Sequence, residues 1–221
     1  FATLKKFADK LGVNLLYCPI STLVEEIEDK LSKKLGQSHT EEAFSVNTIN
    51  YLRSLILTEK AKQTKALVLD TTNKTMLALG QTMLPPITNS FSIVKDLWQS
   101  DLSNLINWRN GNIPTTAKFS RLDLIDANLL LNASHGELHL GEITISITVA
   151  DEVLKLLHEK NFSVSQITNK GYRQELVTML AEAYFTGGMA RKQSPYGIKV
   201  SQRDLGKDLH IPYYHHFHKG V

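Results

Sequence analysis

Residues 127–158, ANLLLNASHGELHLGEITISITVADEVLKLLH, constrain the fold of this chain more than any other stretch. Polar residues alternate along it with Leu138, Leu140, Ile143, Ile145 and Ile147, a period of two that is typical of half-buried strands. From Thr148 the apolar residues fall instead on one helical face, and Thr148 with Asp151 resembles a capping pair. With the apolar run 129–131 and the turn residues 132–136, the stretch predicts a β-hairpin that leads directly into a helix.

The rest of the chain alternates helical and extended patterns without regular βαβ units. Helical periodicity and end signals predict helices at residues 4–11, 23–35, 46–57, 93–106, 149–158 and 169–186. Short apolar runs predict strands at residues 13–18, 66–69, 75–79 and 119–125, the middle two as a hairpin turning at 71–74. We therefore expect an α+β fold, with mixed helices and antiparallel hairpins around one core and a basic C-terminal helical tail.

The charge is distributed unevenly along the 221 residues. From Gly187 to the end there are six Lys or Arg and two acidic residues, whereas the preceding part has 19 basic and 20 acidic residues. The excess positive charge therefore lies in the last part of the chain, which suggests an acidic partner such as nucleic acid. We expect a core domain at residues 1–186 and a basic, His- and Tyr-rich tail at residues 187–221.

The tail contains a pattern that resembles a helix-turn-helix. Ser201 is placed as an N-cap, Leu205 and Leu209 would face inward, Gly206 is small, and Ile211 follows the turn. A second helix after Ile211 could then enter the major groove. The side chains expected to contact phosphates or bases are Arg191, Lys192, Lys199, Arg203, Lys207, Tyr213, Tyr214, His215, His216 and Lys219.

These observations predict a protein that binds nucleic acid as part of a larger assembly. They favour a protein without enzyme activity. One alternative is a structural or assembly protein whose tail docks on a protein partner or on a second copy of the chain. A second alternative is a metal-dependent nuclease of RNase H-like type. In that case Asp70 would hold the ion together with Glu137, Glu142 or Asp151.

Other functional signals are weak. The sequence has no Gly-rich phosphate loop and no GxSxG or HExxH motif, so we expect no catalytic residue and no cofactor. Four histidines in the last twelve residues indicate adventitious metal binding at most. No apolar run is long enough to cross a membrane, and the single Cys18 fits the cytoplasm or another reducing intracellular compartment. Because the chain begins at Phe1, we expect a fragment, with an upstream targeting segment left open.

Overall fold

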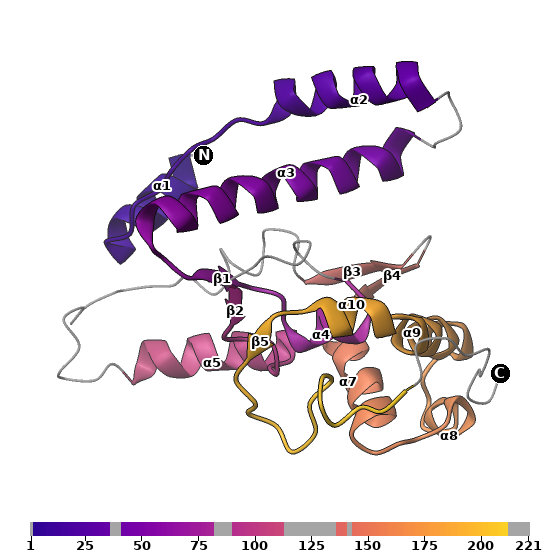
Figure 1. Cartoon of the computed structure of the whole chain (residues 1–221). Helices are drawn as coiled ribbons and strands as arrows, with labels where there is room; N and C mark the ends of the chain where they lie inside the picture. The colour runs from indigo at the N-terminus through magenta and orange to yellow at the C-terminus, as the bar shows by residue number, and fades with distance from the viewer. Residues whose placement is uncertain (1, 36–40, 82–89, 113–135, 141–142, 212–221) are drawn as a thin grey trace. The chain divides into compact units, whose positions relative to one another are not determined.

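The computed structural model describes residues 2–35, 41–81, 90–112, 136–140 and 143–211 (Figure 1). The chain folds into two compact units, one made of Phe1–Ala66 with Ile113–Leu124 and the other of Leu67–Asn112 with Ile125–Val221. Residues 187–211 thus belong to the same unit as the sheet described below. The division into core and tail at residue 187 stays a prediction. No helix among the described residues is long and apolar enough to span a membrane.

The first unit is helical where the structure describes it. Its helices are α1 (Ala2–Leu11), α2 (Ser21–Leu35) and α3 (Glu41–Thr64), and α2 packs against α3. Gly12 follows α1 with a φ of 66°, a backbone conformation that glycine adopts at little cost. The three helices predicted in this region are confirmed, although α3 is longer than the expected 46–57.

The strand predicted at residues 13–18 is not formed. These residues carry no regular secondary structure, and Leu16 and Tyr17 are 70% and 71% exposed. A strand needs a neighbouring strand to accept and donate its ladder hydrogen bonds. Among the described residues no strand pairs with this segment, so its apolar composition was misleading.

A parallel sheet forms the framework of the second unit. Its strands are β1 (Val68–Asp70), β2 (Ser90–Ser92) and β5 (Tyr196–Gly197), in the order β1-β2-β5. Leu69 lies opposite Phe91, and Phe91 lies opposite Tyr196, in one row across the sheet. The expected mixture of helices and strands is confirmed, but the main sheet is parallel and the fold is a mixed α/β fold.

Residues 71–79 turn into a helix and do not return as the second strand of a hairpin. Helix α4 (Lys74–Ala78) follows β1, and Asn73 caps it because its Oδ1 accepts the Met76 N–H at 3.0 Å. Lys74 and Thr75 are buried, as are Leu77 and Ala78. The predicted hairpin is therefore wrong, because a short helix buried on several sides has the same apolar content as a strand.

The hairpin predicted to precede a helix is present among residues 136–158. Strands β3 (Glu137–Leu140) and β4 (Ile143–Ser146) pair in antiparallel fashion and lead directly into α7 (Ile147–His158). The two alternating runs therefore pair with each other; residues 129–131 lie outside the described part. Ser146 occupies the N-cap position, so the proposed cap of Thr148 with Asp151 is wrong.

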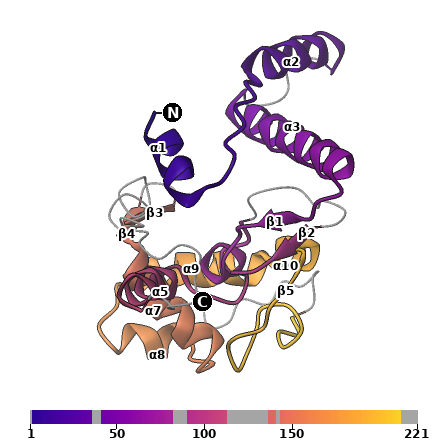
Figure 2. The ribbon, with the colours of Figure 1, turned by 90° about the vertical axis from the view of Figure 1, so that its left-hand side faces the viewer.

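The core of the second unit gathers residues from helices far apart in the sequence (Figure 2). Besides α4 and α7 these are α8 (Val164–Thr168) and α9 (Gln174–Thr186). Helix α5 (Gln99–Gly111) contacts α7, and α10 (Gly188–Gln193) contacts α4 and α9. The residues with almost no exposed area include Leu77, Val153, Leu154, Ile167, Val177 and Leu180. Burial of this apolar surface is the main force that holds the unit together. The helix predicted at 93–106 begins later, at Gln99, and the one predicted at 169–186 is confirmed from Gln174.

Candidate active site

Three loops meet where the strands of the parallel sheet end. Residues 71–73 follow β1, residues 93–98 follow β2, and residues 198–211, here called the C-terminal loop, follow β5. Because the strands are parallel, their carboxyl ends lie at one edge of the sheet, which is where open α/β sheets bind their ligands. The polar residues at this edge therefore form the candidate site.

A buried ion pair joins the start of α4 to the loop that follows β2. Lys74 Nζ lies 2.9 Å from Asp96 Oδ1, and the two side chains are 0% and 2% exposed. The same ammonium donates to Ser201 Oγ and to the Arg203 carbonyl oxygen, each at 2.7 Å. All three protons of the ammonium thus have an acceptor, which a buried charge requires.

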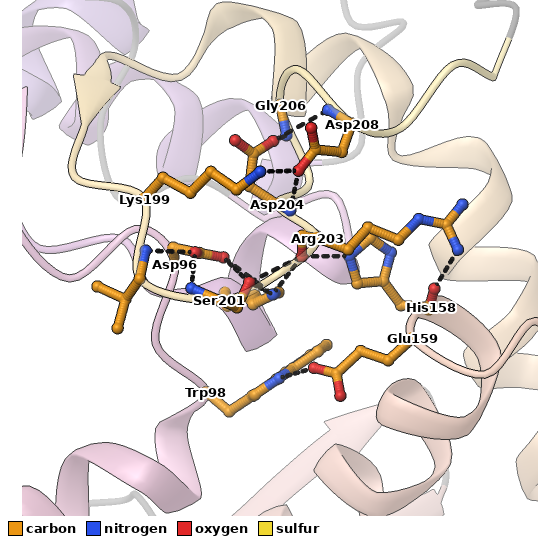
Figure 3. Close-up of polar contacts among 12 residues, drawn as sticks. Asp96, Trp98, His158, Glu159, Lys199, Ser201, Arg203, Asp204, Gly206 and Asp208 are labelled. Carbon is orange, nitrogen blue, oxygen red and sulfur yellow. Dashed lines mark hydrogen bonds and ion pairs between the residues drawn. The ribbon is translucent and has the colours of Figure 1, made fainter.

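Asp96 also fixes the start of the C-terminal loop (Figure 3). Its Oδ2 accepts the backbone N–H groups of Val200 and Ser201 at 2.8 and 2.6 Å, and its Oδ1 accepts the Ser201 hydroxyl at 2.8 Å. Burial by itself would raise the pKa of Asp96, but hydrogen bonds from Lys74, Ser201 and Val200 together lower it. The carboxylate therefore stays ionised beside the Lys74 ammonium.

His158 holds the middle of the C-terminal loop from the other side. Its Nε2 lies 2.9 Å from the Arg203 carbonyl oxygen, which can only accept, so Nε2 carries the proton. Its Nδ1 therefore accepts a hydrogen bond from the Tyr184 hydroxyl, at 2.9 Å. Burial lowers the pKa of His158 and raises the pKa of Tyr184 to about 12. Both side chains are therefore neutral at pH 7, as this hydrogen-bond chain requires.

The C-terminal loop contains no helix, so the first helix of the predicted helix-turn-helix is not formed. Asp204 Oδ1 accepts the N–H groups of Gly206, Lys207 and Asp208 at 2.6 to 3.2 Å. Side-chain acceptors of this kind compete with helical hydrogen bonds. Leu205, which was expected to face inward, does so without a helix: it is 4% exposed in the main core.

A polar pocket opens beside β5, between α10 and the C-terminal loop. Its volume is about 510 Å³, and its wall includes Lys95 and Asp96 after β2, residues 194–199, and residues 204–207. Lys95 is half-buried, and its Nζ donates to the Pro195 carbonyl oxygen at 2.7 Å. Burial lowers the pKa of Lys95, against the opposing effect of Asp204, Asp70 and Asp96.

The structure places the predicted nucleic-acid contacts in different surroundings. Arg191 is 5% exposed and donates to the carbonyl oxygens of Leu77 and Ala78. Arg203 Nη1 donates to the His158 carbonyl oxygen and to Asn161 Oδ1, and Lys199 pairs with Asp208 at 2.6 Å. Lys192 and Lys207 are exposed at the pocket. Tyr213, Tyr214, His215, His216 and Lys219 lie outside the described residues.

The residues that the structure does bring together were not singled out from the sequence. Lys74, Asp96 and Ser201 are separated by 22 and 105 residues, and no spacing rule connects them. The cap signal of Asn73 was available one residue before Lys74. If Asn73 had been interpreted as the N-cap of a helix, Lys74 would have been predicted at the start of that helix, just after a strand and a short loop.

The proposed metal site around Asp70 finds no support. Asp70 Oδ1 accepts the Thr72 N–H at 2.7 Å, which is the local role of a turn residue. Within the described part of the chain, no three His, Cys, Asp or Glu residues are grouped so that they could hold a metal ion. Asp151 is used elsewhere, since it accepts the Thr75 hydroxyl and the Ser100 N–H.

A parallel sheet with helices around it, and with a polar pocket beside the loops that follow its strands, defines the second unit as an α/β ligand-binding unit. Comparison with known proteins gives the family. The sequence pattern of the NAD synthase family, described as "NAD synthase", matches residues 2–194. This chain belongs to the NAD synthase family.

Curated relatives and a solved structure agree with this assignment. The chain is 25% identical over 210 residues to a glutamine-dependent NAD(+) synthetase of Thermotoga maritima, covering 93% of this chain and 35% of the relative. It is also 25% identical over 216 residues to the enzyme of that name from Aquifex aeolicus, covering 97% and 37%. The crystal structure of a glutamine-dependent NAD(+) synthetase from Cytophaga hutchinsonii has the same fold, with a TM-score of 0.71 at 12% identity over 96% of this chain and 36% of that one.

Two functional expectations are thereby overturned. The chain spans little more than a third of the length of these relatives, but it belongs to a family named for a synthetase activity. The predictions of a nucleic-acid-binding protein and of a protein that is not an enzyme are therefore wrong. The charge of the tail was the main argument for them, but Arg191, Arg203 and Lys199 already have partners within the fold.

Proposed function

We propose that this chain is part of the synthetase portion of an enzyme that converts deamido-NAD into NAD by ATP-dependent amidation. The observation that carries the proposal is the family match over residues 2–194, which includes strands β1 and β2 and ends just before β5. The shared fold with the Cytophaga hutchinsonii structure supports the same framework. The NAD(+) synthetase activity for which the relatives are named is attributed to this chain as part of this proposal.

The chemistry of the reaction sets requirements for the site. A carboxylate and ammonia do not form an amide spontaneously in water, because the carboxylate is a poor electrophile, and ATP supplies the activation. The enzyme must therefore hold two ligands, ATP and deamido-NAD, that both carry linked phosphates. The carboxyl edge of the sheet is the expected place for such ligands, and the adjoining pocket has five cationic and two acidic side chains in its wall.

The proposal is tested with the full-length protein that contains this chain. Purified protein is incubated with deamido-NAD, ATP and magnesium, and with either ammonium chloride or glutamine, and NAD is measured by an enzymatic cycling assay. We expect NAD to form only when ATP is present. Reactions without ATP, or with nicotinate in place of deamido-NAD, serve as matched controls. No NAD with either nitrogen source would contradict the proposal, and NAD with ammonium alone would show that glutamine is not used.

A further inference from the structure

The Arg203 carbonyl oxygen is the point at which the C-terminal loop meets two helices. It accepts hydrogen bonds from Lys74 Nζ, at the start of α4, and from His158 Nε2, at the end of α7 (Figure 3). The Arg203 side chain crosses the same junction in return, because its Nη1 donates to the His158 carbonyl oxygen. His158 therefore holds residue 203 through both its ring and its backbone.

Only a neutral His158 ring satisfies both of its hydrogen bonds. Nε2 carries the proton that it donates to the Arg203 carbonyl oxygen, and Nδ1 accepts from the Tyr184 hydroxyl. In a protonated ring Nδ1 carries a proton as well, so the Tyr184 hydroxyl would have to accept and its own proton would need another acceptor. Tyr184 is 3% exposed, and among the described residues its hydroxyl bonds to His158. Protonation therefore leaves a buried donor without its acceptor.

The charged groups around this junction also oppose a second proton on the ring. They are Lys74 of α4, Arg203 of the C-terminal loop, Arg191 of α10 beside the Tyr184 ring, Asp96 after β2 and Glu159 after α7. Three cations thus face two carboxylates, and Asp96 is already paired with Lys74. Burial lowers the pKa of His158, and the charges of Lys74 and Arg203 lower it further, against the opposing effects of the Arg203 carbonyl group and Glu159.

Of the elements that meet at His158, the C-terminal loop can move at the lowest cost. Helices α7 and α9 are fixed by core residues such as Leu154 and Leu180, which have no exposed area. The loop contains no helix or strand, and Asp204 supplies much of its internal hydrogen bonding, since its Oδ1 accepts three N–H groups of the loop itself. These bonds can be kept when the loop moves. The core contact that would be lost is that of Leu205.

The start of the loop stays attached in acid. Asp96 Oδ2 accepts the N–H groups of Val200 and Ser201. Because hydrogen bonds lower the pKa of Asp96, its carboxylate is still ionised at pH 5 and keeps these contacts. The chain between Ser201 and Arg203 is therefore the point about which the rest of the loop can turn.

We propose that protonation of His158 releases residues 203–208 from the helical core, so that the C-terminal loop opens reversibly as the pH falls. The opened loop exposes Leu205 to water. Residues 204–207 also form part of the wall of the pocket beside β5, which would lose that wall. The opening itself does not depend on the reaction, whereas an effect on NAD synthesis rests on the function proposed above.

Proton linkage gives the expected size of the effect. In the open loop His158 is hydrated and titrates near its ordinary pKa of 6.5, whereas in the closed loop its pKa is lower. The closed form is therefore favoured fully above pH 6.5 and loses this advantage as the pH falls toward the lower value. We expect the ratio of open to closed loop to rise about tenfold between pH 7.5 and pH 5.

The test measures how often residue 205 becomes accessible. The full-length protein with Leu205→Cys is labelled with N-ethylmaleimide between pH 5 and pH 7.5, and mass spectrometry quantifies the label on the peptide that contains residue 205. A synthetic peptide of residues 198–211 with the same substitution gives the unprotected rate at each pH. The ratio of the two rates measures the open fraction and should rise about tenfold in acid.

A second labelling site separates opening of the loop from unfolding of the whole unit. Val177 lies in α9 and has no exposed area, so Val177→Cys reacts only when the core unfolds. We expect it to be labelled at least about tenfold more slowly than Leu205→Cys at every pH. Equal rates at the two sites would overturn the local opening.

Two variants then test the role of the His158 ring in the Leu205→Cys background. In His158→Gln the side-chain amide can still donate to the Arg203 carbonyl oxygen but does not titrate, so the tenfold pH dependence should fall below about twofold. His210→Gln changes an exposed histidine of the same loop and should keep the full dependence. A full pH dependence in His158→Gln would overturn the proposal.

Tyr184→Phe keeps the test valid if His158→Gln does not fold. The phenylalanine ring fills the same space, but the hydroxyl that stabilises neutral His158 is lost. The pKa of His158 in the closed loop should then move up toward its ordinary value, and the pH dependence should shrink to about threefold. An unchanged dependence in Tyr184→Phe would contradict the proposed role of this hydrogen bond.

Failure of this inference differs from failure of the proposed function, because the labelling needs neither substrate nor activity. Acid-dependent labelling at residue 205 that requires His158, in a protein that makes no NAD, would support the opening of the loop and contradict the function. NAD synthesis in a protein whose residue 205 is labelled independently of pH would overturn the opening of the loop.

Discussion

Gly80 and Gly187 face each other so closely that neither has room for a side chain. A Cβ placed on Gly187 would lie 2.6 Å from Gly80 Cα and 2.7 Å from Gly80 N. Gly80 also has a φ of 72°, which other residues rarely adopt. This contact lets the residues after α4 and the junction between α9 and α10 pack backbone to backbone.

Replacement of Gly187 by alanine is expected to destabilise the second unit. The added methyl group would overlap with backbone atoms of Gly80, which cannot move aside as a flexible side chain would. We expect the free energy of unfolding to fall by about 2–3 kcal/mol. Urea denaturation measures it. Gly111→Ala is the control, since nothing lies within 4 Å of its added Cβ; a similar loss in both variants would show that the contact is unimportant.

The Lys74–Asp96 pair gives a second stability prediction. In Lys74→Met the Asp96 carboxylate stays buried without its cation, and we expect a loss of about 3–5 kcal/mol in the free energy of unfolding. The double variant Lys74→Met/Asp96→Asn should lose less than the sum of the two single variants. Lys62→Met removes the exposed pair with Glu59 and should cost less than about 1 kcal/mol. Equal losses for Lys74→Met and Lys62→Met would contradict the importance of burial.

Acid should weaken the fold through His158. Because burial lowers the pKa of His158 in the folded state, the unfolded chain binds a proton more readily. The contribution is therefore present above the ordinary pKa of 6.5 and is lost as the pH falls from 6.5 toward the lower folded-state value. Denaturation between pH 5 and pH 8 should show a shallower pH dependence in His158→Gln. The exposed His210→Gln should keep the wild-type slope.

Substitution of the two tryptophans should change the free energy of unfolding by very different amounts. Trp98 is 3% exposed and donates through Nε1 to Glu159 Oε1 at 2.9 Å, whereas Trp108 is 60% exposed. We expect Trp98→Ala to cost about 3–5 kcal/mol in unfolding free energy. Trp108→Ala should change the value by less than about 0.5 kcal/mol. Thermal unfolding followed by circular dichroism compares them, and a large effect at Trp108 would indicate a contact outside the described residues.

Local patterns of sequence predicted much of the helical part of the fold. The stripes of residues 4–11, 23–35 and 169–186 follow a period that depends only on near neighbours, so α1, α2 and α9 were found, although α9 begins later, at Gln174. The β3–β4 hairpin was found for the same reason, since its partners are adjacent in sequence. The pairing of β2 with β1 on one side and β5 on the other connects residues far apart in the sequence, which no local period reports.

The candidate site could not be predicted because its chemistry depends on distant partners. The sequence places Arg203 in a cationic tail, but in the fold its side chain donates to the His158 carbonyl oxygen and to Asn161. Charge counts describe how many cations a segment has; whether each one already has an acceptor is decided only by tertiary structure.

The interaction of Lys74 with Ser201 has a consequence for synthesis on the ribosome. The two residues are 127 positions apart, and translation at about 5–20 residues per second separates their appearance by roughly 6–25 s. During that interval the nascent chain carries Lys74 and Asp96 without the C-terminal loop that satisfies them, and without Leu205 in the core. The second unit therefore cannot complete its fold before the C-terminal loop has emerged from the ribosome.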